Sequence, residues 1–198
     1  MFGRTDPVVW LRYADNSYVS SRLLFFTGFM LEASVSAHRT LELYLKTLLV
    51  ASGIEVRPSS PAWGHRLSQL GTVAAEVDAS FGQEPLQRRL HFFERYFEYV
   101  RYPNDNGSED GSLVWFGFDA NIAPLDEAVA FIRPRIPLPE DAWRSSAISG
   151  LLAESEPQTH QHRALLDGND HINFIACEAT GAPDVTFREE FIFDKPGC

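Results

Sequence analysis

Cysteine is scarce in this chain of 198 residues, which contains only Cys177 and Cys198. Two cysteines cannot build the disulfide framework that stabilises small secreted proteins. Long apolar runs are also missing, because the run LLFFTGFML from Leu23 is far shorter than the roughly 20 residues that a membrane helix needs. The opening residues, MFGRTDPVVW, contain no apolar targeting segment behind a basic one. We therefore expect a soluble protein of the reducing cytoplasm, with no membrane partner.

Basic residues are outnumbered, since 17 Lys and Arg stand against 27 Asp and Glu for a net charge of -10. Indiscriminate binding to nucleic-acid phosphates needs clustered Lys and Arg, so this balance argues against it. From Leu138 onward eleven Asp and Glu stand against four Lys and Arg, a net -7, which leaves -3 for residues 1–137. The prolines of RPRIPLPED forbid regular helix at this boundary and favour an extended linker. We predict a helical domain over residues 1–137 and an acidic C-terminal extension, residues 138–198, that is not an independent domain.

The sequence signatures of several common active sites and metal sites are absent as well. The chain has no glycine-rich phosphate loop, no nucleophile elbow and no paired-cysteine motif. Only the group of His160, His162, His171 and Cys177 has a metal-like composition, and its spacing matches no zinc site. We interpret this group as part of a polar tail, and we expect neither a metal nor a cofactor.

Apolar residues that recur every three and four positions dominate what is present. The longest such stripe runs from Met30 to Gly53 and predicts a helix of roughly 30 Å, along which its neighbours must pack. Other stripes predict helices over residues 7–26, 65–82, 86–102 and about 121–133, the last capped by Asp119 or Asn121. The sequence thus predicts an all-α fold, an up-and-down bundle of four to five helices around the long one.

The C-terminal extension carries weaker signals. Two weak helices are predicted, over Ala142–Glu154 and His160–Leu166. Apolar residues then alternate along two segments joined by TGAPD: Ile172, Phe174 and Ala176, followed by Val185, Phe187, Phe191 and Phe193. This alternation favours a short β-hairpin at the end of the extension.

The fourth predicted helix is apolar over more than half of its circumference. Its aromatic face is made by Phe92, Phe93, Tyr96, Phe97 and Tyr99. A face this wide exceeds what one bundle covers, and aromatic clusters dominate the energies of protein interfaces. We expect a homodimer through this aromatic face.

Three segments, in this order, resemble a known family: LELYLKTLLVASG in the long helix, GHRLSQL at the start of the third helix, and RYP at the end of the aromatic helix. Over roughly residues 8–133 the chain resembles the HEPN superfamily (higher eukaryotes and prokaryotes nucleotide-binding). The resemblance implies a bundle of four or five helices that often dimerises. It also implies a family that includes metal-independent endoribonucleases, frequently toxins paired with a nucleotidyltransferase antitoxin.

Family members that cleave RNA carry an Arg, then four to six intervening residues, then a His, at the end of the late helix. The resemblance matches the Arg to Arg101, but the positions of the His hold Asn106, Gly107 and Ser108. Because the family's general acid or base is missing, the resemblance implies no catalytic residue of the family type and argues against nuclease activity.

Candidate binding residues follow this Arg directly. Arg101 is accompanied by Tyr102, Asn104 and Asp105, and a guanidinium beside amide and carboxylate groups can bind phosphate. In a purely structural role, Arg101 would instead pair with Glu98 and complement the dipole of its own helix.

Three histidines of the bundle are further candidates. His65 matches the histidine of the family's third helix, where we favour hydrogen bonds to free amides or a neighbouring loop over catalysis. His38 and Glu42, one helical turn apart, form either a polar site or a solvated face in which Glu42 pairs with Lys46. His91 lies on a polar stripe of the fourth helix and would replace the missing His only if a dimer brought it near the motif Arg.

We interpret the chain as a catalytically silent HEPN-like domain that acts by binding a nucleotide, RNA or a protein partner. A second hypothesis is a metal-independent endoribonuclease of the toxin type with a rearranged active site. A third hypothesis is a purely structural dimerisation module, for which the aromatic face is sufficient cause.

Overall fold

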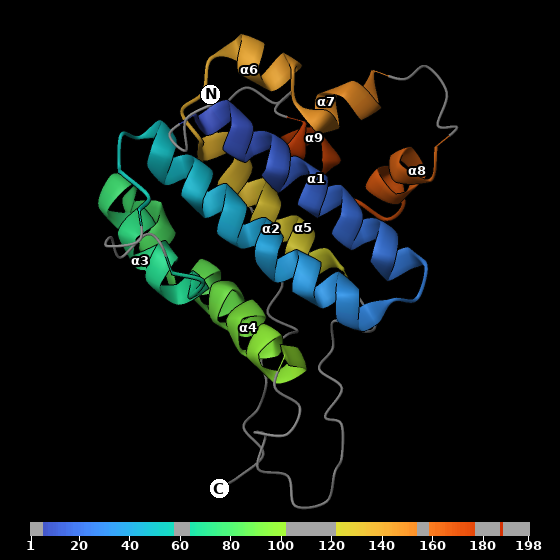
Figure 1. Ribbon diagram of the computed structural model, residues 1–198, viewed down its shortest axis with the longest axis horizontal. Coiled ribbons are helices and arrows are strands. Elements are labelled where there is room, and N and C mark those ends of the chain that lie inside the picture. The colour runs from blue at the N-terminus through green and yellow to red at the C-terminus, as the bar shows by residue number, and fades with distance from the viewer. Residues whose placement is uncertain (1–5, 58–63, 102–121, 154–158, 177–186, 188–198) are drawn as a thin grey trace, which may run out of the picture.

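A computed structural model describes residues 6–57, 64–101, 122–153, 159–176 and Phe187, without the side chains of Tyr99 and Arg101. Within these residues every regular element is a helix, and the helices pack as a bundle, which confirms the predicted all-α class (Figure 1). The elements are α1 (Pro7–Phe26), α2 (Met30–Ala51), α3 (Leu67–Val77), the 3₁₀ helix η2 (Ala79–Gly82), α4 (Glu84–Arg101), α5 (Ala123–Ile132), the 3₁₀ helix η4 (Arg133–Arg135), α6 (Glu140–Arg144), α7 (Ala147–Leu152), α8 (His160–Leu166) and α9 (Ile172–Ile175). None of the helices within the described ranges is both long enough and apolar enough to cross a membrane.

Helices α1 and α2 form the antiparallel pair on which the bundle is built. Asp6 caps α1, since its carboxylate accepts a hydrogen bond of 2.9 Å from the Val8 amide. The chain turns at Gly28, whose φ of +84° lies in the left-handed region that glycine adopts without strain. Ser17 and Ser36 donate to each other's backbone carbonyls over 3.2 and 3.0 Å, so the two helices are joined at small residues that allow close approach.

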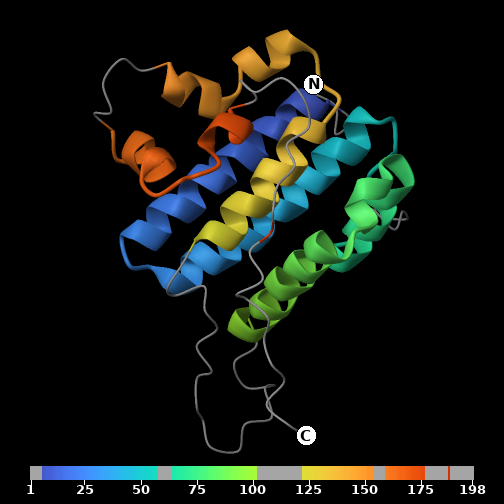
Figure 2. The ribbon, with the colours of Figure 1, turned by 180° about the vertical axis from the view of Figure 1, so that it is seen from behind.

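Helix α2 has the central position predicted for the long helix. It contacts α1, α3, α4 and α5. In Figure 1, α3 and α4 lie along one side of α2 and α1 along the other, and in the reverse view of Figure 2 α5 lies in front of the α1–α2 pair. The α2 helix ends at Ala51, just before Gly53, whose φ is +80°.

Helices α3 and α4 approach each other closely at Gly71. A Cβ atom at this position would lie 2.6 Å from Leu90 Cδ1 and 2.7 Å from Gln87 Nε2, so no larger residue fits without movement. The helix predicted over residues 65–82 is divided in two. Its second part, η2, begins after Asp78, whose side chain accepts a 2.9 Å hydrogen bond from the Ser80 amide and caps the new turn.

The aromatic face of α4 is largely turned into its own chain. Phe93 and Tyr96 are 1% and 5% exposed, and Phe92 and Phe97 are half-buried. The argument that one bundle cannot cover this face is therefore wrong for Phe93 and Tyr96, because α4 packs against both α2 and α3. The side chain of Tyr99 lies outside the described residues, and a homodimer through this face stays a prediction.

The described part of the C-terminal extension packs on the bundle. Helices α7 and α8 contact α1, and α9 contacts α5 (Figure 2). The helix predicted over Ala142–Glu154 is split into α6 and α7, whereas the helix over His160–Leu166 is confirmed as α8. Residues 133–135 continue α5 as η4, so the extended linker begins later than predicted. The domain boundary at residue 137 stays a prediction.

The predicted β-hairpin is wrong in its first segment, because residues 172–175 form helix α9. A short run of apolar residues fits helical and strand periods alike. Packing selects the helix here, since Ile175 is fully buried and its carbonyl accepts a hydrogen bond from Arg133. In the second segment only Phe187 is described, and its ring lies 5.6 Å from that of Phe131 between centroids. The rest of that segment, like the caps proposed at Asp119 and Asn121, lies outside the described residues.

Candidate functional site

The residues proposed to bind a ligand are only partly described. Arg101 is the last residue of α4, but its side chain lies outside the described residues, as do Tyr102, Asn104 and Asp105. His65 is described and lies two residues before α3, a helix that contacts both α2 and α4. The described part of the candidate site is therefore built from His65 and its neighbours.

His65 is held by a carboxylate of the central helix. Its Nδ1 atom lies 3.0 Å from Glu42 Oε2, while the other carboxylate oxygen of Glu42 accepts a 2.6 Å hydrogen bond from Lys46. The His65 side chain is 71% exposed, whereas those of Glu42 and Lys46 are 12% and 4% exposed. The His65–Glu42 pair thus joins a largely buried carboxylate to an exposed imidazole. Through this contact, the residues just before α3 are held against α2.

The Glu42 carboxylate is ionised in this setting. Burial alone would raise its pKa, but hydrogen bonds from Lys46 and His65 outweigh burial and lower the pKa of Glu42 from its usual value. A carboxylate that accepts from Nδ1 fixes the imidazole so that its other nitrogen, Nε2, is the one left for contacts outside the pair. The Glu42–Lys46 ion pair proposed from the sequence is present, but it is largely buried and not part of a solvated face, and the histidine that contacts Glu42 is His65 and not His38.

His38 lies one turn before Glu42 on α2 and is almost completely buried. Its ring stacks on Phe97 of α4 with 4.0 Å between centroids. Burial lowers the pKa of His38 to about 4, although the carboxylates of Glu42 and Glu94 act in the opposite direction. At neutral pH His38 is an uncharged ring between α2 and α4, and its Nε2 atom has no hydrogen-bond partner among the described residues.

Glu94 fastens α4 to the first turn of α3. Its Oε2 atom accepts hydrogen bonds from both the backbone amide and the hydroxyl of Ser68, over 2.8 and 2.7 Å. A carboxylate at the amino end of a helix satisfies a free amide and favours the positive end of the helix dipole. The sequence places Glu94 on a polar stripe of α4, but this contact between helices needed the fold.

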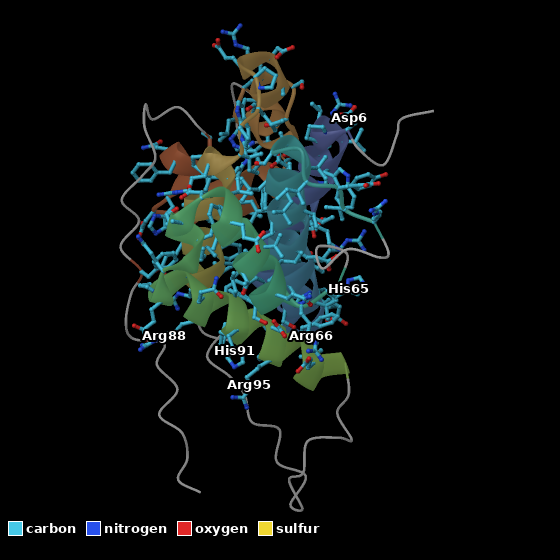
Figure 3. The ribbon with its side chains drawn as sticks, turned by 90° about the vertical axis from the view of Figure 1, so that its left-hand side faces the viewer. Asp6, His65, Arg66, Arg88, His91 and Arg95 are labelled. Atoms are coloured by element: carbon cyan, nitrogen blue, oxygen red, sulfur yellow. The ribbon has the colours of Figure 1, made fainter. Side chains whose placement is uncertain are left out.

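Exposed arginine and histidine side chains lie on the outer surface of α3 and α4. The α3–α4 face, as we call it, is defined by His65, Arg66, Arg88, His91 and Arg95, whose side chains point outward on the same side of the molecule (Figure 3). Arg88 pairs with Glu84 of its own helix, and both side chains are exposed. The sequence signal for this face was available, because residues 88, 91 and 95 follow the spacing of one helical stripe.

His91 is exposed on the α3–α4 face. It precedes Arg101 by ten residues on the same helix, which separates the two positions by roughly 15 Å along the helix axis. Within one chain His91 therefore does not replace the histidine that the family motif places after its Arg.

Two buried ion pairs occupy the opposite side of the bundle, and the sequence did not predict them. Arg22 pairs with Asp126, and Arg133 pairs with Asp15, all four side chains being almost completely buried. From the sequence, Asp126 is expected only to complement the positive end of its helix dipole. For α1 the sequence contained an indication of this burial, because Asp15 and Arg22 lie beside the apolar stripe that packs against neighbouring helices.

The C-terminal extension completes the hydrogen bonds of these pairs. Arg22 donates to the carbonyls of Ala164 and Asp167, and Arg133 donates to the carbonyl of Ile175. A buried guanidinium needs partners for its five donors, so these contacts make the extension part of the buried framework. This cluster is structural, because its members are enclosed.

A tyrosine accompanies each buried pair. Tyr18 donates to Asp126, and Tyr44 donates to Asp15 over 2.7 Å. Burial, together with the neighbouring carboxylate, raises the pKa of both tyrosines well above the usual value. The two phenols therefore stay protonated and keep donating at any working pH.

The histidine group proposed as a polar tail is dispersed. His160 is exposed, His162 is buried on α8, and His171 is half-buried before α9, while Cys177 lies outside the described residues. Among the residues that the structure describes, no group of three His, Cys, Asp or Glu side chains is arranged to hold a metal ion. The expectation that the protein uses no metal stays a prediction.

Comparison with known proteins identifies a family for this chain. No curated protein and no solved structure matches this chain. The family model described as the HEPN domain matches residues 8–113, a span that contains α1 to α4 and more than half of the chain. This chain belongs to the HEPN domain family.

Proposed function

We propose that this HEPN domain is catalytically silent and acts by binding RNA through its phosphates on the α3–α4 face. The observation that supports the proposal is the gathering of exposed arginines and histidines on that face, in a chain whose net charge is -10. Arg66 and Arg95 have no ion-pair partner among the described residues, so their guanidinium groups are available to an anion.

The overall acidity does not oppose binding at this face. Exposed charges more than about 8 Å apart are screened at physiological ionic strength, so a bound phosphate responds mainly to nearby groups. Net charge matters for association from a distance, where the acidic residues 138–198 slow the approach of RNA. We therefore expect weak binding with an affinity that falls steeply as the salt concentration rises. For a single strand, each phosphate contact contributes about 0.7 to the slope of the logarithm of the binding constant against the logarithm of the salt concentration.

The absence of catalysis follows from the chemistry that RNA cleavage needs. Without a metal, one group must take a proton from the 2′-hydroxyl and another must protonate the leaving oxygen, and each such transfer typically contributes about 10² to 10⁴ in rate. Arg101 stays charged at any working pH and cannot exchange protons. Asn106, Gly107 and Ser108, at the positions of the family histidine, do not supply that group.

A rearranged endoribonuclease is the second candidate, and the His65–Glu42 pair is the observation that favours it. Glu42 engages Nδ1 of an exposed imidazole, which is the arrangement that orients a histidine for proton transfer through Nε2. Binding of a nucleotide, binding of a protein and a purely structural dimer are separate hypotheses. None of these three requires that RNA bind to the α3–α4 face.

The binding test measures the fluorescence anisotropy of a labelled single-stranded 12-nucleotide RNA at low and at physiological salt. Arg66→Glu and Arg95→Glu should each weaken binding by about tenfold or more, because each replaces an attraction to phosphate with a repulsion. The matched control is the variant Arg12→Glu, which should leave binding unchanged. Arg12 is an exposed residue of α1, which lies on the other side of α2 from α3 and α4. Equal loss in all three variants, or no binding by the unmodified protein, would remove the proposal.

A cleavage assay in EDTA separates the silent domain from the rearranged nuclease. The purified protein is incubated with structured and unstructured RNA, beside His65→Ala and Arg101→Ala. We expect no cleavage by any of the three proteins. Cleavage by the unmodified protein that both substitutions abolish would establish the rearranged nuclease.

A further inference from the structure

His65 presents one of its ring nitrogens to the solvent. Its Nδ1 atom lies 3.0 Å from Glu42 Oε2, and its Nε2 atom makes no hydrogen bond among the described residues. The other carboxylate oxygen of Glu42 accepts a 2.6 Å hydrogen bond from Lys46, so the carboxylate also pairs with a buried ammonium group. Because the ionised carboxylate accepts from Nδ1–H, any ligand of His65 is bound through Nε2.

Arg66 follows His65 directly and is also available to a ligand. Its side chain is exposed and makes no ion pair with any residue that the structure describes. The neighbouring N-terminus of α3 is not the ligand site, because the Glu94 carboxylate already accepts from the amide and the hydroxyl of Ser68. An imidazole with a fixed orientation and a guanidinium therefore stand at adjacent positions, beside a helix end that its own chain has capped.

We propose that His65 and Arg66 form a subsite for a phosphomonoester, the terminal phosphate of an RNA strand that lies on the α3–α4 face. This inference rests on the proposed function, because the rest of the strand is bound by that face. In Figure 3, His65 lies at one end of the α3–α4 face and Arg88 at the other, with His91 and Arg95 between them. A strand whose terminal phosphate contacts His65 therefore has room to place its internal phosphates beside Arg95 and Arg88.

The reason to choose a monoester is the proton that it can share with an imidazole. A phosphomonoester loses its second proton with a pKa of about 6, so near neutral pH it offers either a P–OH group or a dianion. A neutral imidazole accepts from P–OH through Nε2, and a protonated imidazole donates Nε2–H to the dianion. These are one pair with the proton on one side or the other. An internal phosphodiester has no second proton, so only a protonated imidazole can bind it.

The charge of the ligand favours the same choice. A phosphomonoester carries a charge of about −1.5 to −2 at pH 7, whereas an internal phosphodiester carries a single negative charge. The planar guanidinium of Arg66 can donate to two oxygens of one phosphate group at once. A terminal phosphate thus gains both a stronger attraction to Arg66 and a hydrogen bond to His65. We expect it to raise the affinity of the RNA about tenfold.

The test compares three forms of one internally labelled 12-nucleotide RNA by fluorescence anisotropy at pH 7 and low salt. One form has hydroxyl groups at both ends, one has a 5′-phosphate and one has a 3′-phosphate. At least one phosphorylated form should bind about tenfold more tightly than the hydroxyl form. His65→Ala should remove this preference and change the affinity for the hydroxyl form by less than about twofold. Arg66→Glu should weaken the binding of all three forms, because it places a negative charge on the α3–α4 face.

His160→Ala is the matched control, because His160 is an exposed histidine of α8, outside the α3–α4 face, and its loss should leave the preference intact. Circular dichroism of every variant checks folding. Competition by adenosine monophosphate, with adenosine as its control, identifies the source of the phosphomonoester. If the monophosphate displaces phosphorylated RNA at the concentration at which that RNA displaces itself, and adenosine does not, the subsite is supported with a free nucleotide as its ligand.

The failure of this inference is distinct from the failure of the proposed function. If none of the three RNA forms binds, the proposed function is overturned, and this inference with it. Equal binding of the three forms to the unmodified protein overturns the inference alone. A preference for a phosphorylated form that His65→Ala leaves intact does the same.

Discussion

Arg133 donates a hydrogen bond to the backbone carbonyl of Ile175 and thereby joins the end of α5 to α9. Asp15, from the first helix, pairs with the same guanidinium, and Ser146 accepts a further hydrogen bond of 2.9 Å from it. One buried arginine thus holds together the bundle and two separate parts of the C-terminal extension.

Truncation after Pro137 should destabilise the protein severely, although the sequence alone predicts a soluble helical product. The truncated chain loses the carbonyl partners of Arg22 at Ala164 and Asp167 and that of Arg133 at Ile175. Leaving two buried guanidinium groups short of acceptors costs several kcal/mol, on the order of the whole stability of a domain. Thermal unfolding followed by circular dichroism is the measurement. Truncation after Phe187 is the control, and a Pro137 product as stable as that control would contradict the prediction.

Replacing one member of a buried ion pair should cost more than replacing both. Asp126→Leu leaves the buried Arg22 unpaired and should lower the free energy of unfolding by about 3 to 5 kcal/mol. The double variant Arg22→Met and Asp126→Leu should recover much of this loss, because an apolar pair needs no ionic partner. Urea unfolding of the two single variants and the double variant gives the coupling energy. Strictly additive losses would show that the pair does not act as a unit.

Stability should fall between pH 6.5 and pH 4 because of His38. The pKa of His38 is lowered from 6.5 to about 4 by burial, so between these values the unfolded chain holds a proton that the folded chain does not. The stability that the folded protein has with an uncharged His38 is fully present above pH 6.5. As the pH falls toward 4, the free energy of unfolding decreases progressively, by up to about 3 kcal/mol. The measurement is urea unfolding at pH 4.5 and pH 7.

His38→Gln is the control for this pH dependence. Glu42, Glu94 and His65 lie near His38 and are present in both proteins, so the comparison of slopes isolates the effect of His38. The variant should be less stable at pH 7 but should show a shallower fall toward pH 4.5. Parallel slopes in the two proteins would assign the pH dependence to other groups.

Glu42 should matter far more to stability than the histidine it holds. Glu42→Ala leaves the nearly buried ammonium of Lys46 without its carboxylate, which should cost about 2 to 4 kcal/mol. His65→Ala removes an exposed side chain and should cost less than about 1 kcal/mol. Chemical unfolding at pH 7 measures both losses. The reverse order would mean that His65 anchors its loop mainly through contacts other than the Glu42 pair.

The helices of the bundle could be predicted because their apolar residues repeat with the period of a helix. Asp6 and Gly53 mark the ends of α1 and α2 as expected. The period gives no information on a segment as short as residues 172–175, where the contact with α5 decides between helix and strand. Local pattern therefore sufficed where an element spans several turns and failed where it spans one.

Only part of the candidate site could be predicted from the sequence. His65 and Glu42 each stand out in the sequence, but their contact joins residues 23 positions apart and depends on how α3 packs on α2. Asp15 and Arg133 were missed because charged residues in a sequence are expected at the surface, and 118 positions separate them. Burial of a charge becomes predictable only when its partner is known.

The contact of Arg22 with Ala164 also constrains the order of events during synthesis. The two residues are 142 positions apart, so a ribosome adding about 5 to 20 residues per second needs roughly 7 to 28 seconds between making the arginine and making its acceptor. Throughout that interval α1 carries a charged group that the closed bundle would enclose without its acceptors. We therefore expect the nascent chain to gain little by closing early, and final assembly of the bundle to follow the release of the last helices from the exit tunnel.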